Sequence, residues 1–267
     1  MTPAADIVHF KPIALDFSLH KYLMRPKRQR RDLATMAMRP KKTGILLPMR
    51  VWDGATRLFH WSIVLLVAIS YASISLADGP NANLWIKIHF ISGETMLALL
   101  IFRLVWGIIG SDTSRFQRFI RSPMRAVRYL VDFRRREPDT EIGHNAAGGW
   151  MVLVLLAILL AQVGTGLFSN DDGINEGPLA KFVPKSLSDQ ISSWHGIIFN
   201  VLIALIAVHV LAVLGYLILK GQNLVRPMLT GKKRLPAATP APRMASPILA
   251  TVVIAAAAAI AVTVSRL

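Results

Sequence analysis

Histidine is the residue type in this sequence whose placement suggests chemistry. His9 and His20 lie in a polar N-terminal stretch, where we expect solvated side chains. The other five lie in or at the ends of long apolar stretches, where an ionisable group is costly and usually has a function. Neutral imidazole is a common axial ligand of haem iron. The candidates for that role are His60, His89, His144, His195 and His209.

The separation of His195 and His209 indicates two cofactor positions rather than one. The intervening stretch of helix is about 21 Å long, and the two positions return to within roughly 40° of the same helix face. Two imidazoles that share a face but lie so far apart cannot bind one metal ion. Each can bind a different cofactor, at opposite depths of a membrane.

The apolar segments that carry these histidines have the length of membrane-spanning helices. Hydrophobic residues make up 53% of the chain and charged residues 17%. About 20 apolar residues cross the hydrocarbon layer, and a helix satisfies its own backbone there. We predict an all-α integral membrane protein, with a four-helix transmembrane bundle and a fifth, Ala/Val-rich C-terminal helix just long enough to span. The predicted segments are about 58–77, 86–110, 147–168, 194–219 and 247–264.

Lysine and arginine predict the orientation of these segments. Residues 1–57 hold 12 of them, residues 111–142 hold 8 and residues 220–246 hold 6. The loop 77–84 holds none, and 169–193 holds two. Basic loops stay on the cytoplasmic side of a membrane. The N-terminus is therefore predicted to be cytoplasmic, and the C-terminus lies outside if the fifth segment spans.

This topology places four histidines at two depths. His60 and His209 lie toward the cytoplasmic ends of their segments, and His89 and His195 lie toward the outer ends. We predict two bis-histidine pairs, His60 with His209 and His89 with His195, each holding a noncovalent b-type haem. Hydrogen bonding between helices is the structural alternative, but four histidines at two matched depths favour haem. Zinc is disfavoured because the positions form no tight cluster with carboxylates.

Charged residues lie near the predicted pairs. Arg57 precedes His60 by one helical turn, and Arg103 lies about 21 Å along its helix from His89. Both arginines are at the inner level, where guanidinium groups can pair with haem propionates. Snorkelling to the headgroups explains each arginine equally well. Glu94 could relay protons to a quinone, or it could be a hydrogen-bonded structural acid.

The rest of the chain sets the domain limits. Residues 1–48 are basic and proline-punctuated, which predicts a mostly disordered cytoplasmic tail. Residues 49–230 hold the four helices, and 231–246 reads as a proline-rich linker to 247–267. The chain has no cysteine, which excludes disulfides and c-type haem attachment. The net charge of +16 lies between apolar blocks, which favours membrane lipid as a partner and disfavours nucleic acid.

Short motifs follow one another in order between residues 49 and 230. They are Val51-Trp52-Asp53, Arg57-Leu58-Phe59-His60-Trp61, His89, Phe102-Arg103-Leu104-Val105-Trp106-Gly107, Gly143-His144-Asn145-Ala146-Ala147-Gly148-Gly149, Thr165-Gly166-Leu167-Phe168, Asp171-Asp172, Glu176-Gly177-Pro178-Leu179 and Trp194-His195. Together they resemble the prokaryotic cytochrome b561 family, which includes b-type cytochrome subunits of nickel–iron hydrogenases.

The resemblance implies a four-helix diheme cytochrome of the bacterial inner membrane that transfers electrons between the quinone pool and a redox partner. It implies an anchor subunit of a larger complex, with a c-type cytochrome, a hydrogenase-like subunit or another dehydrogenase subunit as partner. By position, His60, His89, His195 and His209 match the family's iron ligands. His144 matches its Gly-His-Asn motif, and we assign it a hydrogen bond to a propionate. The chain departs from the family in its N-terminal tail and its fifth segment.

Two other functions stay open at this point. One is a stand-alone membrane quinone reductase that takes electrons from a small donor at the outer face. The other is a haem-free transporter that uses its membrane histidines to handle cations, although neither broken helices nor inverted repeats are evident. No nucleophile, acid–base dyad or phosphate-binding loop supports bond-making catalysis. The direction of electron flow and the type of quinone are not predicted.

Overall fold

The computed structural model describes residues 45–132, 140–172 and 175–267. Within these ranges, five helices are long and apolar enough to cross a membrane. The predicted all-α membrane architecture is therefore confirmed, and the fourth helix begins earlier than expected. The five are α3 (Gly54–Ser75), α4 (Ala82–Ile109), α7 (Ala146–Phe168), α8 (Lys185–Lys220) and α10 (Pro247–Ser265).

Polar side chains explain where three of these helices begin. The Asp53 carboxylate accepts a hydrogen bond from the backbone N–H of Thr56 at 2.7 Å, and the Asn145 side chain accepts one from Gly148 at 2.8 Å. Ser246 caps α10 in the same way. Such a cap satisfies an N–H group that the first helical turn leaves open. Asp53 and Asn145 belong to the family-like motifs, so these caps also position the candidate site.

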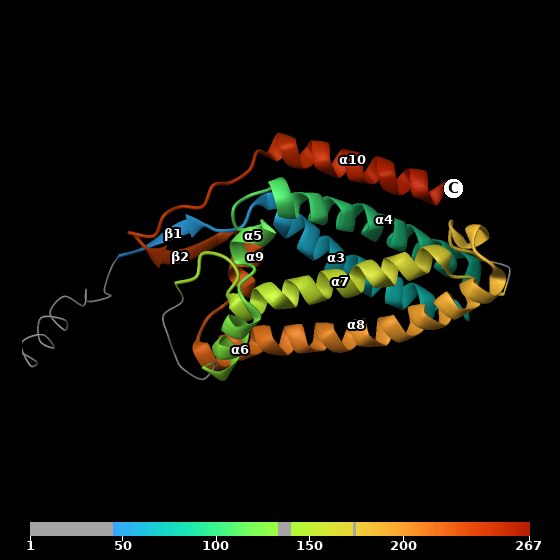
Figure 1. The fold of residues 1–267 in the computed structure, drawn as a ribbon, viewed down its shortest axis with the longest axis horizontal. Helices are drawn as coiled ribbons and strands as arrows, with labels where there is room; N and C mark the ends of the chain where they lie inside the picture. The colour runs from blue at the N-terminus through green and yellow to red at the C-terminus, as the bar shows by residue number, and fades with distance from the viewer. Residues whose placement is uncertain (1–44, 133–139, 173–174) are drawn as a thin grey trace, which may run out of the picture. The chain divides into compact units, whose positions relative to one another are not determined.

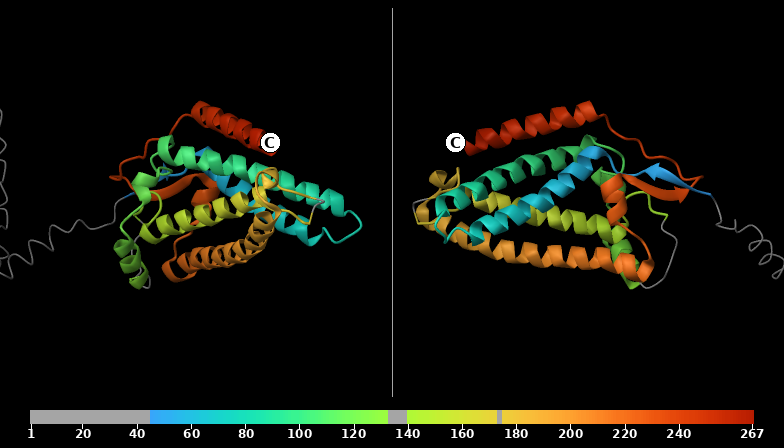
Figure 2. Two further views of the ribbon diagram at one scale, coloured as in Figure 1. Left: turned by 45° about the vertical axis from the view of Figure 1, so that its right-hand side comes forward. Right: turned by 180° about the vertical axis from the view of Figure 1, so that it is seen from behind.

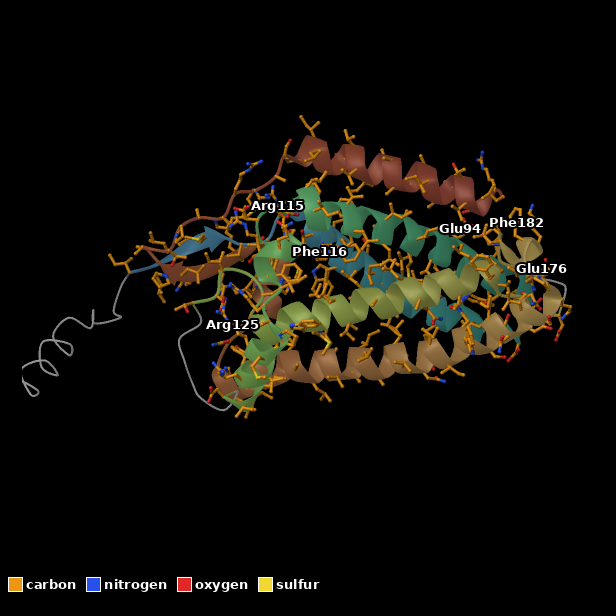
Figure 3. The ribbon with its side chains drawn as sticks, in the orientation of Figure 1. Glu94, Arg115, Phe116, Arg125, Glu176 and Phe182 are labelled. Carbon is orange, nitrogen blue, oxygen red and sulfur yellow. The ribbon has the colours of Figure 1, made fainter. Side chains whose placement is uncertain are left out.

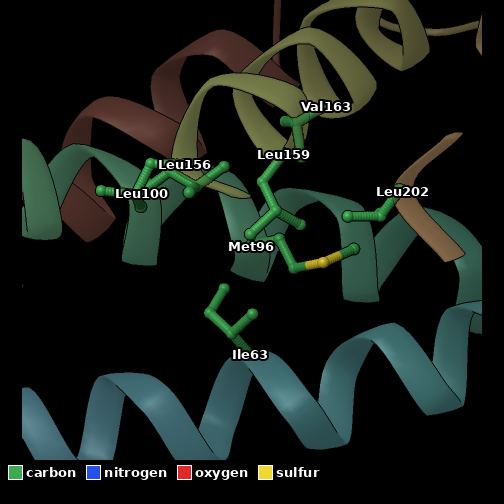
Figure 4. Close-up of a cluster of buried hydrophobic side chains, with 7 residues drawn as sticks. All are labelled: Ile63, Met96, Leu100, Leu156, Leu159, Val163 and Leu202. Carbon is green, nitrogen blue, oxygen red and sulfur yellow. The ribbon is translucent and has the colours of Figure 1, made fainter. Parts of the chain in front are cut away.

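Helices α3, α4, α7 and α8 lie side by side as a bundle (Figures 1 and 2). Buried apolar side chains from all four join them between the two histidine levels. Leu202 of α8 is midway between His195 and His209 in sequence, about 10 Å from each along the helix axis. An apolar layer therefore separates the two levels. Its buried members are Ile63, Met96, Leu100, Leu156, Leu159, Val163 and Leu202 (Figure 4).

Helix α10 packs on α4 and adds to the four-helix bundle from outside (Figure 1). Small residues of α10, Ala250, Val253 and Ala257, form one buried cluster with Phe102 and Trp106 of α4. Small side chains allow helices to approach closely in a membrane. Helix α10 carries none of the predicted haem-binding residues, so the four-helix bundle contains the whole candidate site.

Two short strands lie at the end of the bundle where α3 begins (Figure 1). Strand β1 (Leu46–Arg50) pairs antiparallel with β2 (Lys232–Pro236). The first five residues after Gly231 thus form a strand within the segment interpreted as a linker. The compact unit begins at Leu46, inside the predicted tail. Neither strand alternates polar and apolar residues, and each pairs with a remote segment, so the sequence carries no strand signal. The rest of the predicted tail, 1–44, lies outside the described residues.

The basic segments gather at this same end of the bundle. Arg115 and Arg125 lie there, whereas Glu94 and Glu176 lie toward the opposite end (Figure 3). The 3₁₀ helix η1 (Ala180–Phe182) also lies at that opposite end. We call these the basic end and the acidic end. Three short helices lie at the basic end, namely α5 (Phe116–Phe119), α6 (Pro123–Val131) and α9 (Val225–Thr230).

Candidate functional site

The structure brings His89 of α4 and His195 of α8 together near the acidic end. Their ring centroids are 6.4 Å apart and the ring planes are nearly perpendicular, at 83°. Two imidazoles that ligate one metal ion from opposite sides have ring centroids roughly 6 Å apart, since each metal–nitrogen bond is about 2 Å. The separation of these two rings therefore matches the spacing of a bis-histidine metal site. We call the space around them the outer site.

Hydrogen bonds orient both rings of the outer site. Nδ1 of His89 lies 3.1 Å from the backbone carbonyl of Ser70, which can only accept a hydrogen bond, and 3.1 Å from the Ser70 hydroxyl. Nδ1 of His195 lies 3.0 Å from the Thr165 hydroxyl, which already donates its proton to a backbone carbonyl, that of Ala161 at 2.8 Å. Each Nδ1 is therefore the protonated nitrogen, and each Nε2 keeps the lone pair that a metal needs.

Gln162 of α7 contacts the nitrogen of His195 that would bind a metal. Its Nε2 lies 3.0 Å from Nε2 of His195. Its carbonyl oxygen is buried and has no hydrogen-bond partner. A half-satisfied buried amide is held less firmly than a fully bonded one. Binding of a metal by Nε2 of His195 would require Gln162 to give up this contact.

A cavity of about 350 Å³ surrounds the two histidines. Gly93 and Gly196 line it, and a Cβ atom added at either would meet no atom within 4 Å. At Gly166, a Cβ atom would approach the His195 ring to 3.1 Å, so this glycine lets the ring pack closely on α7. Most of the lining is apolar, as in ordinary cofactor pockets. The outer site therefore offers a flat apolar ligand open space beside paired ring nitrogens.

Glu94 also lines the outer cavity, and it is partly buried. The structure thus places this acid in the outer site, on the helix of His89. The acidic loop between α7 and α8 contributes further lining, including Asn170 and Asp171. Asn170 is held by the side chains of Ser188 and Asp189 on α8. These contacts hold one lining residue of the cavity against the start of α8.

The other two predicted ligands, His60 of α3 and His209 of α8, lie toward the basic end, in the region that we call the inner site. His60 of α3 and His209 of α8 are close enough to interact electrostatically. His144, just before α7, interacts with both of them and with Arg103. The structure therefore gathers His60, His144, His209 and Arg103 at one level of the bundle. Nδ1 of His60 is buried without a hydrogen-bond partner.

Arg103 of α4 is the most deeply buried cation of the inner site, with 3% of its surface exposed. Its guanidinium carbon lies 4.8 Å from the centre of the Phe116 ring. One terminal nitrogen is buried and lacks a partner. A buried cation is stable only when it is paired or hydrogen-bonded. This side chain therefore has unused capacity to bind an anion.

Asp53 lies close to Arg103 and carries a hydrogen-bonded carboxylate. Burial alone would raise the pKa of Asp53, but hydrogen bonds from the backbone of Thr56 and the hydroxyls of Ser111 and Ser114 hold that pKa below its ordinary value. The indole N–H of Trp106 also donates a hydrogen bond to this carboxylate, at 3.3 Å. The ionised Asp53 thus supports the charge of Arg103 and ties the start of α3 to α4.

Arg57 lies in the first turn of α3, one turn before His60. One terminal nitrogen donates to the backbone carbonyl of Leu229 at 2.5 Å. Its Nε is buried and lacks a partner. Gly231 lies beside this side chain with a φ of +76°, and a Cβ atom there would approach the backbone oxygen of Trp52 to 2.9 Å and Arg57 Nε to 3.3 Å. Like Arg103, this arginine has a donor left for a cofactor carboxylate.

His144 is packed between two aromatic rings. Its ring centroid lies 4.7 Å from that of Trp52 and 4.6 Å from that of Phe119. Its Nδ1 is buried without a partner. Burial, followed by the charge of Arg103, lowers the pKa of His144 to about 3. The ring is therefore neutral at physiological pH and keeps a hydrogen-bonding nitrogen inside the inner site.

Sequence reasoning missed Ser70, Thr165 and Gln162 as partners of the predicted ligands. Their roles depend on which residues face the histidines across helix boundaries, and common polar residue types carry no such signal. Residues 45–132, 140–172 and 175–267 contain no group of three His, Asp or Glu side chains placed to hold a metal ion together. The histidines lie at two depths of the bundle instead.

A bundle of apolar helices with histidines at two depths is the arrangement expected of a membrane cytochrome of the b type. The family model of prokaryotic cytochrome b561 matches residues 51–231. The chain belongs to this family, so its cofactor is haem b and it acts in membrane electron transfer. The match begins and ends close to the predicted limits of the four-helix region.

Two curated relatives share one description. A probable Ni/Fe-hydrogenase B-type cytochrome subunit of Bradyrhizobium diazoefficiens is 21% identical over 69% of this chain and 85% of its own length. A protein of that description from Rhizobium leguminosarum bv. viciae is 23% identical over 68% of this chain and 87% of its own length. The alignments thus cover most of each relative. No solved structure matches the chain.

Proposed function

We propose that this chain binds two b-type haems, one at each site, and passes electrons between a membrane quinone and a redox partner protein. The observation that carries this proposal is the pairing of His89 and His195 with ring centroids 6.4 Å apart. Haem b supplies a one-electron change of oxidation state, tuned by its ligands and surroundings. The chain's own residues hold, orient and shield it from water.

At the outer site, His89 and His195 are the iron ligands, and Ser70 and Thr165 hold their Nδ1 atoms. Anchoring a ligand from its second nitrogen fixes the ring orientation and raises its basicity. Gly93 and Gly196 leave room for the porphyrin face. Glu94, in the same cavity, is a candidate to pass protons when a quinone is reduced or oxidised nearby.

At the inner site, His60 and His209 are the iron ligands. The buried, unpartnered nitrogens of Arg57, Arg103 and His144 support this assignment, because they match the carboxylates of haem propionates. Two arginines give charge-assisted hydrogen bonds, and a neutral His144 gives one more without adding charge. The three residues would hold the propionates of a haem bound at the inner site.

The apolar layer around Leu202 separates the two sites by about 21 Å along α8. It excludes water and ions from the route between them, so that electrons can cross while charged solutes cannot. We assign the basic end to the cytoplasm, because basic segments remain on that side. The N-terminus is then cytoplasmic, in the inner membrane of a bacterium, and the outer site faces outward.

The descriptions of the two relatives as hydrogenase subunits support a hydrogenase as the partner, with this chain as its membrane anchor. A c-type cytochrome or another dehydrogenase subunit are the other partner classes. A stand-alone quinone reductase would need no bound partner at all. Co-purification of a tagged chain from its native membrane distinguishes these cases, because an anchor subunit retains a stoichiometric redox protein.

The exchange of electrons with quinone is tested by placing the purified haem-loaded chain in lipid nanodiscs. The haems are reduced with dithionite, excess reductant is removed, and a membrane quinone such as menaquinone or ubiquinone is added. We expect the visible spectrum of the haems to return to that of the oxidised protein after the quinone is mixed in. Haems that stay reduced with both quinones would contradict the quinone part of the proposal, while leaving haem binding intact.

A further inference from the structure

Helix α6 is fixed across the basic end of the bundle by contacts at both of its ends. At its start, the Trp150 indole of α7 donates to the backbone carbonyl of Arg121 at 3.0 Å. At its other end, Tyr129 stacks on Tyr216 of α8, and Lys220 lies 4.7 Å from the Tyr129 ring centre. These contacts join α6 to both α7 and α8. The figures show that α6 runs crosswise to these two helices (Figures 1 and 2).

These contacts place α6 at the level where the membrane meets water. Trp150 lies in the second turn of α7, and Tyr216 and Lys220 lie in the last turns of α8. Tryptophan, tyrosine and lysine at helix ends mark the headgroup region of a bilayer. A helix that bridges spanning helices at this level lies in the plane of the membrane surface, on the side to which we assign the cytoplasm.

The side chains of α6 divide into three faces. Ala126 is buried against the protein. Met124 and Val131 are 66% and 79% exposed, and Val127 is exposed beside them. Consecutive residues of a helix are about 100° apart, so these three apolar side chains fall within an arc of about 60°. An exposed apolar face of this kind is unfavourable in water and favourable in acyl chains.

The third face of α6 is basic. Arg125 and Arg128 are exposed and lie about 60° apart on the helix, roughly 100° from the centre of the apolar face. Arg121 precedes the helix and is exposed as well. The helix itself, Pro123–Val131, contains no acid. Guanidinium groups bind phosphate with paired hydrogen bonds.

We propose that α6 is an interfacial helix that binds the headgroups of anionic phospholipids. Met124, Val127 and Val131 enter the acyl-chain boundary, and Arg125 and Arg128 bind the lipid phosphates. We favour an anionic lipid over an acidic protein as the partner, because the arginines lie beside an apolar face at the depth of the headgroups. This inference rests on membrane insertion alone and does not depend on haem binding or on the choice of redox partner.

The charge part is tested on the purified full chain by native mass spectrometry with added phosphatidylglycerol or phosphatidylcholine. We expect tighter binding of phosphatidylglycerol, and a roughly tenfold loss of that preference in Arg125→Ala/Arg128→Ala. The matched control is Arg226→Ala/Lys232→Ala, which removes two exposed charges from the same end of the bundle. An equal loss in the control, or no preference in the wild type, would overturn the proposal.

The apolar part uses the absence of native cysteine, which makes a single introduced thiol unique. Val127→Cys and, as control, Arg226→Cys are spin-labelled in nanodiscs, and their access to oxygen and to a water-soluble nickel chelate is compared. We expect the label at 127 to favour oxygen and the label at 226 to favour the chelate. Chelate access at 127 in phosphatidylglycerol nanodiscs would mean that this face is left for a protein partner, against the proposal.

Discussion

The hydroxyl of Thr165 lies 3.0 Å from Nδ1 of His195, across the contact between α7 and α8. This bond is made by a residue type that occurs throughout membrane helices, yet it decides which nitrogen of His195 can bind iron.

Thr165→Val keeps the shape of the side chain and removes its hydroxyl. We expect the outer haem to bind roughly 10- to 100-fold more weakly, as is usual when the second-shell partner of a ligating histidine is lost. Haem content after graded dilution into apo-myoglobin, a haem acceptor, measures this change. Thr263→Val is the control, because Thr263 makes the same kind of bond to the carbonyl four residues earlier, that of Ala259, on α10. Equal haem loss from both variants would mean a general loss of stability.

Histidine replacements separate the two sites. His89→Ala or His195→Ala should remove the outer haem and leave the inner one, so that the haem content falls by half. His60→Ala or His209→Ala should have the reciprocal effect. The remaining haem is identified by its midpoint potential in a redox titration. If all four variants lost both haems in equal proportion, the assignment of two independent pairs would be wrong.

Arg103→Leu removes a buried cation from the inner site. A positive charge near haem disfavours the ferric state, so we expect its loss to lower the midpoint potential of the inner haem by about 60 mV or more, roughly tenfold in the one-electron equilibrium. Arg103→Lys should shift the potential less, because it keeps the charge. Arg118→Leu, at an exposed position, should leave it unchanged. Retention of the wild-type potential in Arg103→Leu would argue that this arginine does not face a haem.

His144 should make the folded state sensitive to acid. Its folded-state pKa of about 3 lies below its ordinary value of 6.5. Between these two values the unfolded chain binds more protons, so the free energy of unfolding falls as pH falls through this window. The slope for one proton is at most about 1.4 kcal/mol per pH unit. His144→Gln should lose less thermal stability than the wild type between pH 7.5 and 5. Parallel losses would show that His144 is already solvated.

The features that could be predicted from the sequence are those that depend on long, regular helices. Apolar length predicted the spanning helices, and the separation of His195 and His209 predicted two levels in the bundle. Both depend on the regular rise of a helix, which is known before any packing is seen. The Gly143-His144-Asn145 motif singled out His144 as a candidate site residue, because a motif can be read from neighbouring residues alone.

Features that depend on remote contacts could not be predicted. Leu47 and Leu235 face each other in the β1–β2 pair, but nothing local in either segment favours a strand. Ser70 and Gln162 reach the histidine ligands only because α3 and α7 pack in one particular rotation. The packing of α10 on α4 likewise depends on which of its many alanines face Phe102.

The most direct test of the account is the haem content of the purified chain. A reduced-minus-oxidised visible spectrum, with haem counted per polypeptide by pyridine haemochrome, measures both the type and the number of haems. We predict a b-type spectrum with two haems per chain. One haem per chain would mean that only one histidine pair binds iron, and no haem after expression with sufficient haem would contradict the central claim.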